Sequence, residues 1–184
     1  GRRTVFIPTA SLVEDDAFFV DKDQKALEKF GLEIDKLEVA TASSYEIREK
    51  IKGADSIFVS GGNTFFLLQE LRRTGADLLI EDHIQAGKLY ISTSAGSIIM
   101  SPNIEYVKHM DDVAQGPLLR GDYTALGMVD FYLTPHCTSD IYREACEKIK
   151  AQYGQSLNLL VINDSQVVTV LGDQTEVLTL PTNK

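Results

Sequence analysis

Residues 89–100 read LYISTSAGSIIM, an apolar strand followed by a turn of small residues and the apolar start of a helix. This order is typical of a nucleophile elbow, in which a serine at a sharp strand-to-helix corner exposes its Oγ and the next backbone N–H groups face the atom that Oγ attacks. Ser94 is therefore a candidate nucleophile, and the alternative is a helix N-cap serine. Ala95 and Gly96 allow strand and helix to approach closely, whereas Ser92 stands where the G-x-S-x-G pattern has glycine.

The composition is typical of one soluble globular domain over residues 1–184, with 43% hydrophobic and 24% charged residues. Asp and Glu outnumber Lys and Arg by 27 to 18, and no basic block is present, so nucleic acid is not an expected partner. No stretch of about 18 apolar residues and no basic-then-apolar leader is present, so we expect no membrane partner and a cytoplasmic location. Composition sets no expectation for the oligomeric state.

The two cysteines, Cys137 and Cys146, lack the spacing of a metal site, and a lone pair of cysteines is weak evidence for a disulfide. We expect both to be free thiols. No other motif indicates a metal ion or an organic cofactor, and none is expected.

Segments with the apolar pattern of strands alternate with segments that have the pattern of helices. Besides the strand that enters the elbow, the expected strands are 4–7, 32–39, 55–60, 130–134 and 158–162, the expected helices are 14–30, 43–53, 64–74, 77–86 and 139–153, and a hairpin is expected over 166–180. This alternation predicts an α/β three-layer sandwich with a mainly parallel sheet and helices on both faces. We expect Phe19, Leu27 and Phe30 to face inward, and His83 to lie on a solvated helix face.

Four groups of polar or flexible residues directly follow expected strands. They are Gly61-Gly62-Asn63, Ser94, Pro135-His136 and Asn163-Asp164. Because ligands bind beyond the carboxyl ends of the strands in open parallel sheets, we expect these groups to meet at one edge of the sheet. A serine, a histidine, a carboxylate and unpaired backbone N–H groups are the parts that acyl transfer requires.

His136 is the candidate general base, because imidazole titrates close enough to neutrality to take and return a proton. The alternative is an ordinary loop histidine, and His109 in the irregular segment 102–123 is a weaker rival base. Asp164 is the first candidate for the carboxylate that orients His136, and the alternative is a turn-forming Asn-Asp-Ser sequence. Asp111 is the second candidate for that carboxylate.

The candidate oxyanion hole consists of the backbone N–H of Ala95 and an N–H in the Gly61-Gly62 turn. Missing side chains there let backbone donors reach a developing negative charge. The alternative is a plain tight turn in which Asn63 caps the next helix, and both interpretations can hold together.

Several motifs together resemble the peptidase E (aspartyl dipeptidase) family of serine peptidases. They are SGGNTFFLL at 60–68, LYISTSAG at 89–96, Pro102 and TPH at 134–136, and the resemblance runs from TVFIP at 4–8 to the C-terminal hairpin. It implies a class I glutamine amidotransferase-like (flavodoxin-like) fold with serine in place of the elbow cysteine, and metal-independent hydrolysis. It also implies that Ser94 is the nucleophile, that His136 is the base, and that Gly62 and Ala95 form the oxyanion hole.

The match to the family pattern is less regular elsewhere. Asp164 takes the place of a family glutamate, while a family aspartate proposed for the same role aligns near residues 109–111. Ser92 replaces the elbow glycine, and the loop after His136 is short. The family's first strand and helix, ahead of residues 4–8, have no counterpart in this sequence, so we expect a missing strand to leave apolar surface exposed.

The resemblance also implies substrate contacts. Arg143 takes the place of a family arginine that pairs with a substrate carboxylate, a geometry that guanidinium suits, and the alternative is a solvated helix arginine. Asn63 is the second candidate for binding substrate. The function implied is a serine exopeptidase for dipeptides or short peptides, including those with N-terminal aspartate. Two alternatives stay open: a catalytically weak member that binds a small carboxylated metabolite, and an esterase or amidase for non-peptide substrates.

Overall fold

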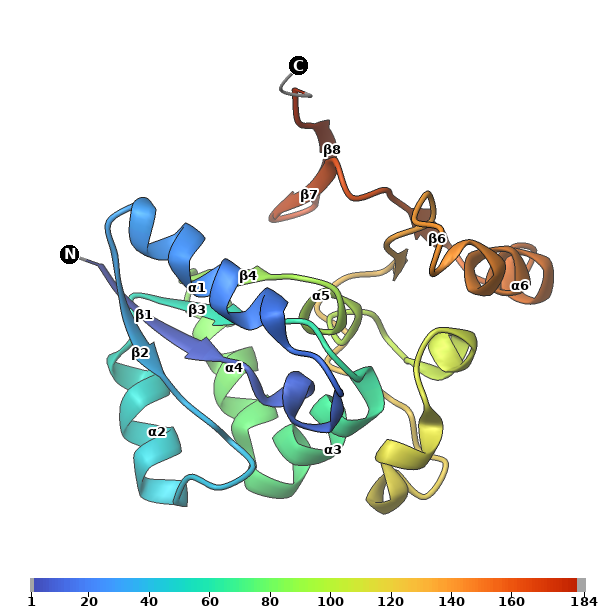
Figure 1. The fold of residues 1–184 in the computed structure, drawn as a ribbon. Coiled ribbons are helices and arrows are strands. Elements are labelled where there is room, and N and C mark those ends of the chain that lie inside the picture. The colour runs from blue at the N-terminus through green and yellow to red at the C-terminus, as the bar shows by residue number, and fades with distance from the viewer. Residues whose placement is uncertain (1, 182–184) are drawn as a thin grey trace.

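The computed structural model describes residues 2–181, in which strands and helices alternate along the chain (Figure 1). The strands are β1 Arg2–Ile7, β2 Leu32–Lys36, β3 Ser56–Val59, β4 Leu89–Ser92, β5 Tyr132–Thr134, β6 Leu159–Val161, β7 Gln166–Leu171 and β8 Gln174–Thr179. The α-helices are α1 Phe18–Lys29, α2 Ser44–Gly53, α3 Thr64–Thr74, α4 Ala76–Gln85, α5 Ala95–Ile98 and α6 Arg143–Tyr153. Short 3₁₀ helices are η1 Thr9–Val13, η2 Glu105–His109, η3 Val113–Gln115 and η4 Pro117–Leu119.

Strands β1 to β4 form a parallel sheet in the order β2-β1-β3-β4. Strand β5 pairs in parallel with β6, and β7 pairs antiparallel with β8. The predicted α/β fold with mainly parallel strands is therefore confirmed, although the paired strands of the described residues fall into three sheets.

The two faces of the four-stranded sheet bury different side chains, as the alternation of a strand requires. Val5 and Ile57 belong to the large core cluster that includes side chains of α2, α3 and α4. Phe6 and Phe58 point the other way, stack with their ring centroids 5.2 Å apart, and pack against α1. Figure 1 shows α1 on one face of the sheet and α2, α3 and α4 on the other. The sheet is thus the middle of three layers.

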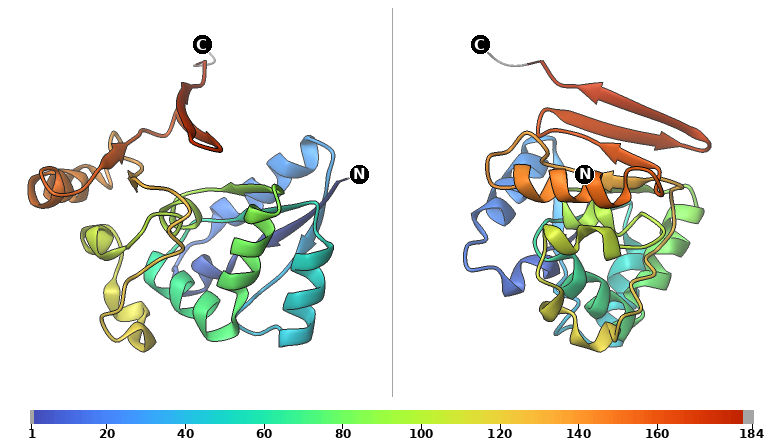
Figure 2. Two further views of the ribbon diagram at one scale, coloured as in Figure 1. Left: turned by 180° about the vertical axis from the view of Figure 1, so that it is seen from behind. Right: turned by 90° about the vertical axis from the view of Figure 1, so that its right-hand side faces the viewer.

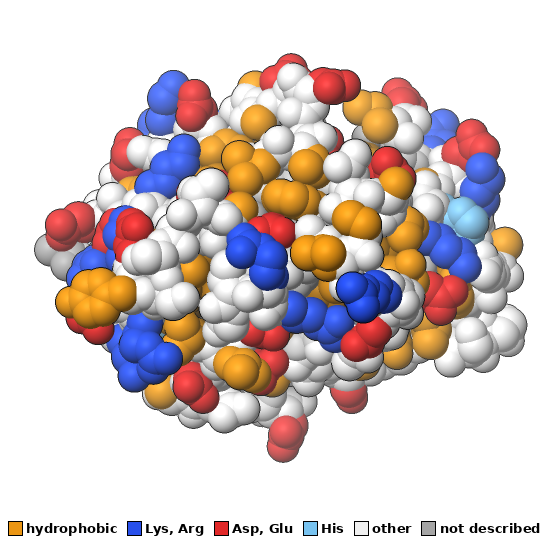
Figure 3. Space-filling view, turned by 90° about the horizontal axis from the view of Figure 1, so that it is seen from below, with side chains coloured by type: hydrophobic (Ala, Val, Ile, Leu, Met, Phe, Trp, Pro, Cys, Tyr) orange, Lys and Arg blue, Asp and Glu red, His pale blue; other side chains and the backbone are white. Residues whose placement is uncertain are grey.

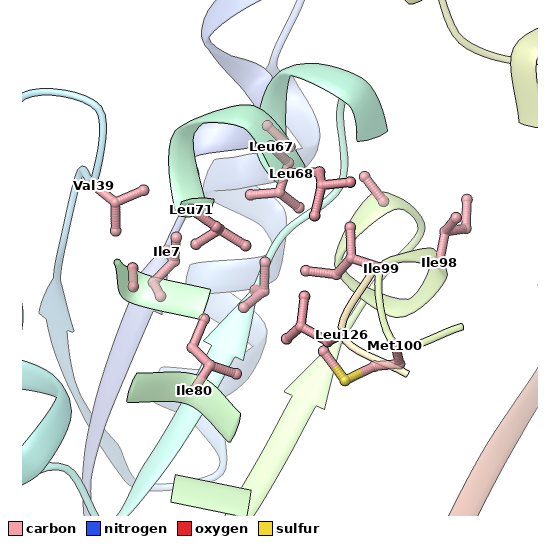
Figure 4. Packing of buried hydrophobic residues seen from close by; sticks show 14 of the residues in the cluster. Ile7, Val39, Leu67, Leu68, Leu71, Ile80, Ile98, Ile99, Met100 and Leu126 are labelled. Atoms are coloured by element: carbon pink, nitrogen blue, oxygen red, sulfur yellow. The ribbon is translucent and has the colours of Figure 1, made fainter. Parts of the chain in front are cut away.

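The core is continuous from α3 and α4 to the elbow helix α5 (Figure 4). Leu68 and Leu71 of α3, Ile80 of α4, and Ile98 and Ile99 at the end of α5 all lie in one buried cluster. Because protein interiors are close-packed, this contact holds the short α5 rigidly against the sheet.

Local signals set two helix ends where they were predicted. The Ser43 Oγ accepts a hydrogen bond from the Glu46 backbone N–H at 3.1 Å and caps α2. Gly75 ends α3 with φ 74°, a left-handed conformation that glycine adopts at little cost.

The first predicted helix differs from the structure in its start and in its buried face. The chain first forms η1, and the Phe18 backbone N–H donates to the Asp16 Oδ1 at 3.1 Å, so α1 begins four residues later than expected. Leu27 is buried, as predicted. Phe30 is 84% exposed, and its prediction is wrong because α1 ends at Lys29, which takes Phe30 off the inner face.

The predicted solvated position of His83 is also wrong. Its side chain lies on the inner face of α4, one turn after the buried Ile80, and is only 5% exposed. The imidazole Nε2 lies 3.2 Å from the Leu89 carbonyl oxygen. Burial lowers the pKa of His83, since removal from water disfavours the charged form.

Residues 102–131 form an irregular segment that contains η2, η3 and η4, as expected for 102–123, and the strand expected from residue 130 begins at Tyr132. Beyond β6, the hairpin of β7 and β8 stands apart from the four-stranded sheet (Figure 2). On the face shown in Figure 3, Lys and Arg side chains lie among Asp and Glu side chains. No helix within residues 2–181 has the length and apolar character needed to cross a membrane.

Candidate active site

Ser94 lies at a sharp corner between β4 and α5. Its backbone has φ 46° and ψ −115°, and within residues 2–181 only Ser94, Arg120 and His136 combine a side chain with positive φ. Such conformations cost about 1–3 kcal/mol each and cluster at functional sites. Two of the three strained residues are the predicted nucleophile and the predicted base.

Two glycines make the close approach at the elbow possible. A Cβ at Gly61 would lie 3.1 Å from the Ser94 Cβ, so the Gly61-Gly62 turn lies directly against the serine. A Cβ at Gly96 would lie 2.4 Å from the Val59 carbonyl oxygen, so α5 packs on β3 only because this residue has no side chain. The residues predicted to form an elbow and an oxyanion hole are therefore adjacent.

The predicted oxyanion donors are unpaired within the backbone. No carbonyl in residues 2–181 accepts a hydrogen bond from the N–H of Gly62 or Ala95. Gly62 has φ 132°, and a Cβ there would lie 2.2 Å from the Ala10 carbonyl oxygen, so only glycine fits. Two backbone donors next to a serine are what an oxyanion hole requires.

His136 and Asp164 follow the paired parallel strands β5 and β6, which brings them to the same end of this sheet. The His136 Nδ1 donates to the Asp164 Oδ1 at 2.5 Å. Asn163 also forms the predicted turn, because its Oδ1 accepts from the Ser165 backbone N–H at 2.9 Å. The hydrogen-bonded pair is partly exposed, with 30% of the His136 side chain and 57% of the Asp164 side chain accessible. Helix α5 contacts β5, so the segments that carry Ser94 and His136 are neighbours.

Tyr142 contacts the candidate base and was missed by the sequence reasoning. Its ring stacks on the His136 imidazole, with centroids 5.2 Å apart and an angle of 28° between the planes. Burial raises the pKa of Tyr142, and the nearby carboxylates of Asp111, Glu14 and Asp164 raise it further. An aromatic residue six positions after a histidine carries no spacing signal, so only the tertiary structure identifies this contact.

Asp111, the second candidate for the triad carboxylate, is bonded elsewhere. Its Oδ2 accepts from the Thr64 backbone N–H at 2.8 Å, at the N-terminus of α3, where a negative charge is stabilised by the helix dipole. Burial raises the pKa of Asp111 to about 6, and the charge of Glu14 adds to this effect. The geometry thus places Asp164 on the histidine and Asp111 beside the glycine turn.

The two candidate substrate-binding residues are occupied by protein partners. The Asn63 Oδ1 accepts from the Phe66 N–H at 3.0 Å and caps α3, while its Nδ2 donates to the Asp112 carbonyl at 3.1 Å. The Arg143 Nη2 donates to the Asp140 Oδ1 at 2.5 Å on the surface. These contacts favour the capping interpretation of Asn63 and the solvated interpretation of Arg143.

The prediction of two free thiols is wrong, because Cys137 and Cys146 form a disulfide. The loop after His136 returns over α6, which brings the two Cα atoms to 5.5 Å, within the range that a disulfide needs. The bond therefore ties the residue next to the candidate base to α6.

His109, the rival base, has its Nε2 2.8 Å from the Gln152 Oε1 of α6. Within residues 2–181, no group of three or more His, Cys, Asp or Glu residues is placed to hold a metal ion.

Comparison with known proteins identifies the family. The sequence model of Peptidase family S51 matches residues 1–178. An uncharacterized peptidase of Pasteurella multocida (strain Pm70) is 51% identical over 170 residues, which cover 92% of this chain and 82% of the relative. Peptidase E of Shewanella amazonensis is 35% identical over 138 residues, 75% of this chain and 55% of that protein.

A crystal structure from Listeria monocytogenes EGD-e, described provisionally as a peptidase E, superposes with a TM-score of 0.94. It shares 44% sequence identity with this chain, covering 98% of this chain and 87% of that one. The predicted resemblance to peptidase E-type serine peptidases is confirmed. The chain belongs to Peptidase family S51.

Proposed function

We propose that this peptidase is an exopeptidase that cleaves dipeptides or short peptides through an acyl-enzyme on Ser94. The observation that carries the proposal is the strained Ser94 corner, where the N–H groups of Ala95 and of Gly62 in the adjacent turn have no backbone partner within residues 2–181. Strain at such a position persists where the surrounding structure enforces it, most often at a functional site.

The His136–Asp164 pair supplies the proton transfers in the proposed reaction. The bond from the His136 Nδ1 to Asp164 leaves Nε2 with the lone pair that takes the Ser94 proton. The Ser94 Oγ then attacks the scissile carbonyl carbon, and the N–H groups of Gly62 and Ala95 donate to the oxyanion. The protonated His136 returns the proton to the leaving amine, and water cleaves the acyl-enzyme by the same steps in reverse order.

The charges around the site support action at a free N-terminus. The carboxylates of Glu14, Asp111 and Asp164 lie near enough to raise the pKa of Tyr142, which stacks on His136, and Asp164 bonds His136 directly. Negative charge is therefore present on the side of the candidate base that carries Tyr142 and Asp164. An N-terminal ammonium is attracted to such a site, because opposite charges within a few ångströms stabilise each other. An N-terminal aspartate side chain is repelled unless Arg143 leaves Asp140 to bind it. The proposed substrates are therefore short peptides with a free amine, and aspartate is a test case among them.

The experiment that tests this function is the release of N-terminal residues from dipeptides and aminoacyl p-nitroanilides, each with a free and with an acetylated amine. We expect turnover of the free amines, loss of turnover by at least about 10³-fold in Ser94→Ala, and retention in Ser97→Ala. Ser97 is the matched control because it belongs to the same helix and its Oγ bonds the Ser92 Oγ at 2.8 Å.

Two results would contradict the proposal. Equal turnover of acetylated and free substrates would contradict the exopeptidase assignment. Absence of both turnover and covalent labelling of Ser94 by a fluorophosphonate probe would contradict acyl transfer altogether, because an activated serine reacts with such a probe.

A further inference from the structure

A carboxylate interrupts the apolar stripe of helix α1. Val20, Asp23 and Leu27 follow the i, i+3, i+7 spacing of one helix face, and Val20 and Leu27 pack in the buried cluster with Phe6 and Phe58. Burial raises the pKa of Asp23, because removal from water disfavours the carboxylate. An apolar residue would therefore suit this position better if packing of α1 were its only role.

The two partners of Asp23 are hydroxyl groups that immediately precede the candidate site. The Asp23 Oδ2 accepts from the Ser60 Oγ at 3.2 Å and from the Thr93 Oγ1 at 3.1 Å. Ser60 leads into the Gly61-Gly62 turn, and Thr93 leads into Ser94. One carboxylate oxygen thus joins the residue before the oxyanion turn to the residue before the nucleophile.

We infer that Asp23 is a positioning residue that holds the Gly61-Gly62 turn and Ser94 at their working separation, and so sets the rate of acylation without touching the substrate. The inference rests on the proposed function. Oxyanion donors and nucleophile must be placed within a few tenths of an ångström for full effect, because small displacements at such sites cost large factors in rate.

The sheet alone does not provide this connection. The β3–β4 ladder pairs Val59 with Ser92, and the last backbone bond beyond it runs from the Thr93 N–H to the Val59 carbonyl at 3.1 Å. Between Ser60 and Thr93 themselves, the bridge is the side chain of Asp23. Asp23 therefore extends the pairing of the two strands by one residue, at the point where the backbone leaves the sheet.

A substitution that changes stability and activity in opposite directions separates a positioning role of Asp23 from a packing role. Asp23→Leu completes the apolar stripe of α1, so we expect an equal or higher Tm, together with a kcat lowered by about 10- to 100-fold and a KM changed by less than about twofold. Labelling of Ser94 by a fluorophosphonate probe slows by the same factor. Asp23→Asn keeps an acceptor oxygen and gives a smaller loss, and Asp21→Asn, an exposed carboxylate of the same helix, serves as the control.

The inference is overturned if Asp23→Leu retains wild-type kcat and labelling rate, or if its loss of activity merely follows a fall in Tm. Amide hydrogen exchange tests it without any substrate, at the bonded N–H groups of Asn63, which donates to the Ala10 carbonyl, and Thr93, which donates to the Val59 carbonyl. We expect at least about tenfold faster exchange at these amides in Asp23→Leu. Unchanged exchange overturns the positioning role even where the wild type hydrolyses peptides. A further outcome is faster exchange in Asp23→Leu while the wild type neither hydrolyses peptides nor reacts with the fluorophosphonate probe. That result supports the positioning role and contradicts the proposed function.

Discussion

The nucleophile and the base of the candidate site are held in two different ways. The elbow region, residues 2–100, fixes Ser94 by buried backbone contacts such as the approach of Gly96 to Val59. The base region, residues 130–165, holds His136 by side-chain contacts with Asp164 and Tyr142 at the surface. The comparison indicates that substitutions at the close backbone contacts of the elbow change stability and activity together. Substitutions of the exposed side chains that hold His136 change activity with little change in stability.

The base region contains one covalent link. The disulfide between Cys137 and Cys146 fixes the residue next to His136 to α6, while β5 and β6 are only three residues long. A short two-stranded sheet is marginally stable without further packing. Buried packing in this region comes from the small cluster of Phe131, Leu133 and Ile162 and from Ile149 of α6, which joins the large core. His136 itself is held outside these clusters by partly exposed side chains.

Asp164→Asn is expected to have the largest effect in this comparison, and that effect is on kcat. The variant loses the carboxylate that orients the His136 imidazole, so we expect kcat to fall by about 10²- to 10⁴-fold. The Tm should change little, because a partly exposed pair of polar side chains contributes about 0–1 kcal/mol. Steady-state kinetics and thermal unfolding of the same preparation check both points. A fall in Tm of many degrees would show that the contact between His136 and Asp164 is needed for the packing of the base region.

The second effect is on stability, from Gly96→Ala in the elbow region. The added methyl group would lie 2.4 Å from the Val59 carbonyl oxygen, so β3 and α5 must separate, and we expect a loss of about 3 kcal/mol in the free energy of unfolding together with a loss of activity. Urea unfolding measures the first, and p-nitroanilide turnover the second.

Gly31→Ala is the control for this substitution. Its backbone has φ 78°, but nothing lies within 4 Å of an added Cβ, so only the left-handed conformation costs energy, about 1 kcal/mol. If the two variants were equally stable, the close approach of β3 and α5 would not be what fixes the elbow.

The same comparison explains what the sequence could predict. Helix 64–74 was predicted with its observed bounds, because Asn63 and Gly75 mark its ends by local chemistry. The elbow followed from small residues that are adjacent in the chain. The disulfide and the stacking of Tyr142 on His136 depend on the path of a loop, which no local pattern encodes.

The roles of the carboxylates could not be predicted for the same reason, because their hydrogen-bond partners are distant in sequence. Asp164 and Asp111 were both plausible partners of His136, and the pairing of β5 with β6 decides which one reaches it. The bridge from Asp23 to Ser60 and Thr93 spans 37 and 70 residues, and sequence reasoning did not identify it.

The smallest expected effect comes from Asp111, which lies in the segment between the two regions and bonds the Thr64 N–H of the elbow region. Its pKa of about 6 in the folded protein exceeds the value of about 3.9 in an unfolded chain, so the folded state binds more protons between these pH values. The stabilising contribution of this group is therefore present below about pH 4 and is lost as the pH rises through about 6.

The side chain introduced by Asp111→Asn carries no charge at any pH, so the variant does not show this loss of stability as the pH rises. We expect the variant to be about 1–3 kcal/mol more stable than the wild type at pH 7, with the difference shrinking toward pH 4, and with kcat close to the wild-type value. Urea unfolding at pH 4, 5, 6 and 7 measures the first point, and p-nitroanilide turnover the second. A kcat loss as large as that of Asp164→Asn would make Asp111 the partner of His136 during catalysis. The base would then be positioned from the elbow region, and the contrast between the two regions would fail.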